Sequence, residues 1–253
     1  MARIIAISSG KGGVGKTTTT INLAAALTEF KYAVIIVDAN MTTSNISLHL
    51  GLHFKPITLN DVFEKNAKLI DAIYQHENGF KVIPADISIR KTPNPNTHEY
   101  IDLLYDLSAH ADFVLVDTPA GLGKETLSII EAVDELITVT NPELAAITDA
   151  MKLSVHASKL ETHNLGVVIN RVRNVSHELP ASHIERMLDL PILGIIPEDR
   201  EVGRAIAHKK PVVSFSPNSL AAQHFKAVAA RLIGEQYTPK TGLRQKILNW
   251  FRS

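Results

Sequence analysis

The sequence contains no cysteine. Disulfide bonds, cysteine-ligated zinc and cysteine-bound iron–sulfur clusters are therefore excluded, and a reducing cytosol is the expected compartment. Neither sign of charge is in excess, since 26 Lys and Arg residues balance 26 Asp and Glu residues. No apolar run approaches the length of a membrane span, and Met1 leads into an apolar strand without a signal-peptide pattern. We therefore expect a cytoplasmic protein whose charge-driven contacts come from local patches.

Short apolar runs rich in β-branched residues alternate with longer segments of helical periodicity. The predicted strands cover residues 3–8, 33–38, 80–85, 112–117, 135–140, 165–170 and 191–196. The predicted helices cover residues 17–30, 99–107, 122–133, 143–160 and 182–188, with a last helix after residues 216–218 that runs to about 235. This pattern predicts an α/β fold with a doubly wound, mostly parallel sheet. We expect one domain over residues 1–236 and a basic tail over residues 237–253.

The segment 10–17, GKGGVGKT, lies directly after a predicted strand and before a predicted helix. It matches the phosphate-loop pattern G-x-x-x-x-G-K-[ST], in which Lys16 neutralises the β- and γ-phosphates and Thr17 places a hydroxyl on Mg²⁺. Glycines let successive N–H groups point toward the phosphates, and the helix N-terminus adds positive partial charge. The alternative is a glycine-rich turn with incidental lysines. The predicted nucleotide-binding residues here are Gly10, Lys11, Gly12, Gly13, Val14, Gly15, Lys16, Thr17 and Thr18.

Two predicted strands end in aspartate, at Asp38 and Asp117. The carboxyl ends of parallel strands meet at the ligand-binding edge of such a sheet, so both carboxylates are expected to face the phosphates. Aspartate also begins many turns, which is the structural alternative for each. With the phosphate loop present, we predict a magnesium site served by Thr17, Asp38 and Asp117.

The motifs together resemble a known family. KGGVGKTT resembles the deviant Walker A motif of the MinD/ParA family of ATPases, VDANMTTSNISLHLGL its switch I segment, and DTPAGLG its switch II segment. INRV at 169–172 and GIIPED at 194–199 are similar to its adenine-side segments. The resemblance runs from residue 2 to about 235, and the MinD-like branch fits best. It implies a P-loop NTPase of the deviant Walker A type, an ATPase with ATP and Mg²⁺ as ligands.

The resemblance also gives the extra lysine of the loop a role. In such proteins the early lysine reaches across a nucleotide-sandwich dimer, so Lys11 is expected to act on the phosphates of the partner subunit, as an arginine finger does. A solvated loop lysine is the alternative. Lys11, Lys16, Asp38, Asn40 and Asp117 form the expected catalytic set.

Asn40 departs from the family pattern, which often has a second carboxylate at this position of switch I. Asparagine can position a water molecule by hydrogen bonding, but it cannot take a proton. We therefore expect slow hydrolysis, or hydrolysis completed by a partner protein.

The base is expected to bind at the ends of two later strands. The amide of Asn170 can pair with the Watson–Crick edge of adenine, and the aspartate-bearing motif of guanine-specific relatives is absent here, which favours ATP over GTP. A strand-end turn residue is the alternative for Asn170. Pro197, Glu198 and Asp199 are expected to supply backbone walls for the base.

The tail carries basic residues and no acidic side chain. Built as a helix, it places Leu243, Ile247, Leu248, Trp250 and Phe251 on one arc. Such a helix fits an interfacial membrane anchor, and it is similar to the membrane-targeting segment of MinD proteins. Alternatively, it packs on its own domain, or it remains solvated or docks on a protein.

These expectations combine into one function. We expect an ATP-dependent homodimer that binds an anionic membrane surface through residues 243–252, reversibly and at the inner face of the cell membrane. It would position a cell-division or other polar apparatus with an activating or cargo protein. The alternatives are a ParA-like DNA-partition ATPase, a metal-centre assembly ATPase and a slow or non-hydrolysing scaffold. The balanced charge argues against nucleic acid as a partner.

Overall fold

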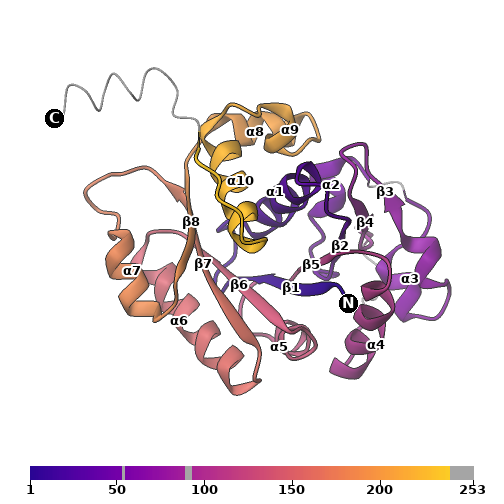
Figure 1. The fold of residues 1–253 in the computed structure, drawn as a ribbon. Coiled ribbons are helices and arrows are strands. Elements are labelled where there is room, and N and C mark those ends of the chain that lie inside the picture. The colour runs from indigo at the N-terminus through magenta and orange to yellow at the C-terminus, as the bar shows by residue number, and fades with distance from the viewer. Residues whose placement is uncertain (53–54, 89–92, 240–253) are drawn as a thin grey trace.

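The computed structural model describes residues 1–52, 55–88 and 93–239. Within these residues the chain forms one eight-stranded sheet in the order β3-β4-β2-β5-β1-β6-β7-β8 (Figure 1). The strands are β1 (Arg3–Ser8), β2 (Val34–Asp38), β3 (Tyr74–Gln75), β4 (Lys81–Ile83), β5 (Phe113–Asp117), β6 (Glu135–Thr140), β7 (His163–Val172) and β8 (Ile192–Pro197). The paired strands run parallel except for β3, which pairs antiparallel with β4 at one edge. The predicted doubly wound, mostly parallel fold is confirmed.

Helices cover both faces of the sheet. They are α1 (Lys16–Glu29), α2 (Ile46–Leu50), α3 (Leu59–Phe63), the 3-10 helix η1 (Leu69–Ala72), α4 (Thr97–Ser108), α5 (Lys124–Glu131), α6 (Leu144–Lys159), α7 (Ala181–Leu188), α8 (Arg200–Ala207), α9 (Val212–Phe215) and α10 (Leu220–Leu232). Among the described helices, none is long and apolar enough to cross a membrane.

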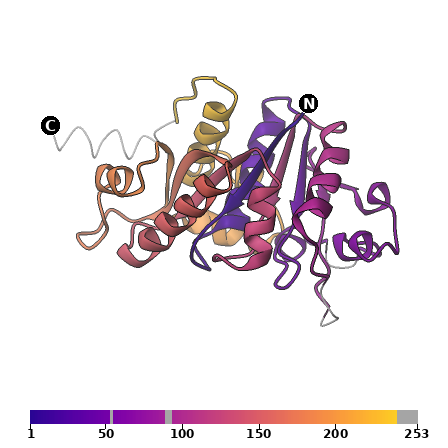
Figure 2. The same ribbon diagram turned by 90° about the horizontal axis from the view of Figure 1, so that it is seen from below.

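The sheet is buried between two layers of helices, which explains the apolar strand sequences. Ile5 and Ile7 of β1 pack with α1 and α10 on one face. Ala6, between them, packs with α4 and α5 on the other. Figure 1 shows α1 and α10 on one side of the sheet and α4, α5 and α6 on the other, and Figure 2 views the molecule from the side of this second layer. Successive residues of β1 therefore serve opposite cores.

The register of the central strands sets the position of the two aspartates. Asp38 of β2 lies directly opposite Asp117 of β5, and Ile7 of β1 is paired with Asp117 from the other side. All three strands run in the same direction, so their carboxyl ends meet at one edge of the sheet. The loop that follows β1 lies at this edge.

The short elements were not predicted from the sequence. β3, α2, α3, η1, α8 and α9 are each short, and a short apolar segment carries little periodicity. The chain beyond α10 also differs from an isolated tail, because Tyr237 donates a hydrogen bond to Gln223 Oε1 at 2.9 Å and packs edge-on against Phe30. The division of the chain at residue 236 stays a prediction.

Candidate functional site: a phosphate loop with two buried aspartates

The loop between β1 and α1 has the shape of an anion-binding site. Gly15 precedes the first residue of α1 with φ 99°, and Gly13 has φ 79°. Both values lie in the left-handed region that glycine adopts without strain. Among the described residues no side chain caps the N-terminus of α1, so its first N–H groups are available to a ligand.

Lys16, Thr17 and Asp117 form the polar centre of the site. Lys16 is 8% exposed, and burial lowers the pKa of its ammonium group while the charge of Asp117 opposes that shift. Thr17 Oγ1 donates to Asp117 Oδ2 at 2.6 Å, and Thr20 Oγ1 lies 3.3 Å from Asp117 Oδ1. Burial raises the pKa of Asp117 to about 6, against the hydrogen bond from Thr17 and the charge of Lys16. The structure thus brings Thr17 and Asp117 into direct contact, with Lys16 close enough for its charge to act on Asp117.

Asp38 is fully buried beside this group and organises the segment after β2. Its Oδ2 accepts from Ser44 Oγ at 2.6 Å and from the Ile46 N–H at 3.3 Å, and its Oδ1 accepts from the Asn40 N–H at 3.3 Å. Burial and the nearby charge of Asp117 raise the pKa of Asp38 to about 7, although these hydrogen bonds lower it. Sequence reasoning missed Ser44 and Ile46, which lie beyond the strand end that singled out Asp38.

The side chain of Asn40 is engaged within its own loop. Its Nδ2 donates to the Thr43 carbonyl at 2.8 Å, and its Oδ1 accepts from Thr43 Oγ1 at 3.0 Å. This is an asparagine turn of the kind that competes with other uses of the amide. In this conformation the amide closes the loop, and its role toward a water molecule stays a prediction.

Lys11 lies at the surface of the loop. Its Nζ is 3.4 Å from Glu143 Oε2, and the two side chains are 45% and 52% exposed. Glu143 directly precedes α6 and was not predicted as a site residue. An exposed pair of this kind contributes about 0–1 kcal/mol, so Lys11 is free to leave it for another anion.

A cavity of about 440 Å³ lies beside the loop. The predicted base-contacting residues Asn170, Pro197, Glu198 and Asp199 all line it, together with Thr18 of α1, and its role as a base pocket stays a prediction. Arg171, from the predicted adenine-side segment at 169–172, also lines it. Further walls that the sequence did not indicate come from Arg200, Val202, Gly203, Ile206 and Phe225. The volume lies within the range of small-ligand sites. A larger cavity of about 720 Å³, near Met1 and Tyr105, includes no residue of the phosphate loop.

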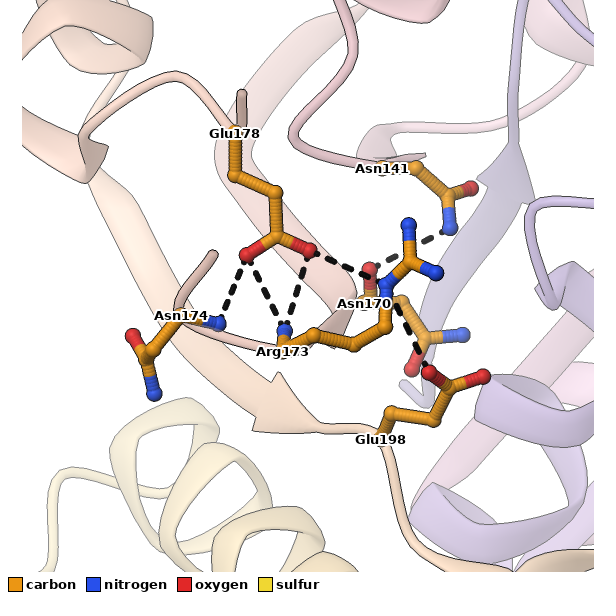
Figure 3. Close-up of polar contacts among 6 residues, drawn as sticks. All are labelled: Asn141, Asn170, Arg173, Asn174, Glu178 and Glu198. Carbon is orange, nitrogen blue, oxygen red and sulfur yellow. Dashed lines mark hydrogen bonds and ion pairs between the residues drawn. The ribbon is translucent and has the colours of Figure 1, made fainter. Parts of the chain in front are cut away.

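A polar network connects the loop after β7 to Glu198 at the wall of the cavity beside the phosphate loop (Figure 3). The Glu178 carboxylate accepts from the backbone N–H groups of Arg173 at 3.0 Å and Asn174 at 2.7 Å. Burial alone raises the pKa of Glu178, but these N–H groups outweigh it and hold the pKa below its ordinary value. Arg173 Nε lies 3.6 Å from Glu198 Oε2, so an ion pair connects the loop after β7 to the wall of the cavity. Asn141 donates to the Asn170 carbonyl at 3.3 Å.

The predicted membrane-contacting residues Leu243, Ile247, Leu248, Trp250 and Phe251 lie outside the described residues.

Comparisons with known proteins agree with this geometry. Residues 1–233 match the model of the ParA family, described as NUBPL iron-transfer P-loop NTPase. An uncharacterized ATP-binding protein of Methanocaldococcus jannaschii is 43% identical over 237 residues, which are 94% of this chain and 90% of that protein.

Solved structures show the same relationship. The septum site-determining protein MinD of Pyrococcus horikoshii, complexed with Mg-ADP, is 36% identical with a TM-score of 0.87, covering 92% of this chain and 96% of that one. MinD in the MinC:MinD cell division complex of Aquifex aeolicus is 28% identical with a TM-score of 0.83, covering 95% and 99%. The chain therefore belongs to the ParA family of P-loop NTPases and is MinD-like in sequence and structure.

Proposed function

We propose that the protein is a molecular switch that binds ATP with Mg²⁺, dimerises around the nucleotide and hydrolyses it to ADP and phosphate. The observation that carries this proposal is the hydrogen bond between Thr17 and Asp117 beside the buried Lys16 at the open N-terminus of α1. Relatives support the ligand, since one is named as an ATP-binding protein and another was solved with Mg-ADP.

The donor set suits a magnesium nucleotide. A magnesium ion is ordinarily held by one or two oxygen side chains together with phosphates and water, and Thr17 and Asp117 offer such oxygens. When bound, the ion would supply positive charge to the phosphate oxygens. Lys16, whose ammonium pKa is lowered by burial, would gain a strong anionic partner in the phosphates. The Asp117 carboxylate, whose pKa is raised by burial, would gain a nearby cation that stabilises its charged form.

The position of Lys11 supports the proposed dimerisation. A charge exposed at the edge of the loop and weakly held by Glu143 is available to the phosphates of a second subunit. Such a charge arrives only with the partner, so hydrolysis would depend on dimerisation. Asp38 and Asn40 would orient the attacking water in that state. Because Asn40 cannot accept a proton, we expect slow turnover without an activating protein.

The tail would convert nucleotide state into location. Each large apolar side chain gains at most about 1.5–3 kcal/mol on full burial. Ordering about ten residues costs roughly 1–2 kcal/mol each, so one tail should bind an anionic membrane marginally. Two tails on one dimer bind with avidity. The ATP-bound dimer would reside at the inner face of the cell membrane and position a cell-division or other polar apparatus, in keeping with the MinD relatives.

Light scattering during gel filtration tests the switch. The protein should have the mass of a dimer with Mg·ATP and of a monomer with Mg·ADP, and it should release phosphate over several turnovers. Lys11→Ala should remain a monomer with ATP while still binding it, whereas Lys16→Ala should lose nucleotide binding. A nucleotide-independent mass would contradict the switch. A dimer without turnover would favour a nucleotide-dependent scaffold.

A further inference from the structure

Asn170 occupies an irregular place in β7. The pairing register between β7 and β8 shifts between Ile169 and Val172, and the intervening Arg171 has φ 57°. Such a bulge re-aims the side chains beside it. Here it leaves the Asn170 side chain 5% exposed, at the wall of the base pocket.

The amide of Asn170 contacts the phosphate loop directly. Its Nδ2 donates to the Val14 carbonyl at 2.8 Å in a buried hydrogen bond. A carbonyl oxygen only accepts, so the amide must turn its nitrogen to the loop, which leaves its oxygen for the pocket. Figure 3 shows this oxygen on the side where Glu198 lies. The orientation of the amide is therefore dictated by the loop.

The contact also restricts the residue that follows Val14. A Cβ atom on Gly15 would lie 2.1 Å from Asn170 Nδ2, so the amide fills the space that a side chain at Gly15 would need. The peptide between Val14 and Gly15 is planar and trans, so its C=O and N–H groups point in opposite directions. Holding the Val14 carbonyl toward β7 therefore turns the Gly15 N–H away from β7, at the N-terminus of α1.

We infer that Asn170 is a positioning residue of the phosphate loop, which orients the Gly15 N–H for the phosphates in addition to lining the base pocket. This inference rests on the proposed binding of ATP. It differs from a role in base recognition alone, because the loop would need Asn170 even for a ligand without a base. Occupation of the base pocket would in turn stiffen the loop, since the amide that the base contacts is the one that holds Val14.

Inorganic tripolyphosphate separates the two roles, because it carries the phosphates of ATP without the base. Isothermal titration calorimetry would measure the Kd of Mg·ATP and of Mg·tripolyphosphate for the wild type, Asn170→Ala and a control variant, Val202→Ala. Val202 lines the base pocket but is not part of the phosphate loop. Circular dichroism and the melting temperature of the ligand-free protein would establish that each variant is folded, with Asn170→Ser as the replacement if Asn170→Ala is not.

We expect Asn170→Ala to weaken Mg·tripolyphosphate on the order of tenfold, as the loss of a buried hydrogen bond implies. Mg·ATP should weaken by at least the same factor, because the contact with the base is lost as well. Val202→Ala should weaken Mg·ATP but leave the Kd of Mg·tripolyphosphate unchanged. If a folded Asn170 variant loses affinity for Mg·ATP alone, the inference is wrong and the proposed function stands. If the wild type binds neither ligand, the proposed function itself fails.

Discussion

The buried carboxylate of Asp38 should make the nucleotide-free protein less stable as the pH rises. Its pKa is raised from 3.8 to about 7, mainly by burial, so the folded state holds a proton that the unfolded state has released. The stabilisation from this proton is fully present below pH 3.8 and is lost as the pH passes through about 7. Between pH 5 and pH 8 the shift corresponds to a loss of about 2–3 kcal/mol.

The test compares the wild type with Asp38→Asn, whose amide does not titrate. Differential scanning calorimetry at pH 5 and pH 8, without nucleotide, should show a fall in Tm for the wild type that exceeds the fall for the variant by roughly 5–10 °C. The comparison subtracts the effect of the buried or partly buried histidines His49, His76 and His224, whose lowered pKa values change stability with pH in the opposite direction. If Tm fell by the same amount in the two proteins, the loss of stability would not come from the proton held by Asp38.

Three further predictions concern the site and the tail. Lys16→Ala should weaken Mg·ATP binding by at least tenfold in calorimetry, because a buried charge expected to face the phosphates is lost. Lys11→Ala should bind Mg·ATP within a few-fold of the wild type, and equal losses in the two variants would contradict their separate roles. Asn40→Asp should raise the steady-state rate of phosphate release, since a carboxylate can accept the proton of the attacking water. An unchanged or lower rate would show that residue 40 does not limit turnover. The double variant Trp250→Glu, Phe251→Glu should keep the ATPase rate measured without vesicles, but its affinity for anionic vesicles in ATP should fall at least tenfold. Ser253→Glu is the control for added charge, and unchanged vesicle binding by the double variant would show that the tail does not contact the membrane.

The sequence predicted the elements whose physical signal is local. The phosphate loop could be recognised because Gly10, Gly15, Lys16 and Thr17 have the spacing of the pattern, and because a predicted strand and helix flank it. The positive φ of Gly15 shows why glycine is needed there. Asp38 and Asp117 could be predicted together because each ends an apolar strand, and parallel strands align their carboxyl ends. The long helices and the central strands follow from periodicity in the same way.

The contacts that shape the site could not be predicted, because each rests on a single bond, two between segments far apart in the chain and one within the loop after β2. Ser44 reaches Asp38, Glu143 reaches Lys11 and the Asn170 amide reaches Val14, and no local pattern marks any of these partners. The turn at Asn40 could not be predicted from its residue type either. Its amide hydrogen-bonds with Thr43 in this structure, and its role toward a water molecule stays a prediction.

Co-sedimentation with anionic vesicles tests the central claim, that nucleotide state determines where the protein resides. The purified full-length protein would be centrifuged with vesicles of anionic phospholipid in Mg·ATP and in Mg·ADP, with neutral vesicles as the control. We expect the protein to pellet with anionic vesicles in Mg·ATP and to remain in the supernatant in Mg·ADP. Equal pelleting in both nucleotides, or none in either, would contradict it.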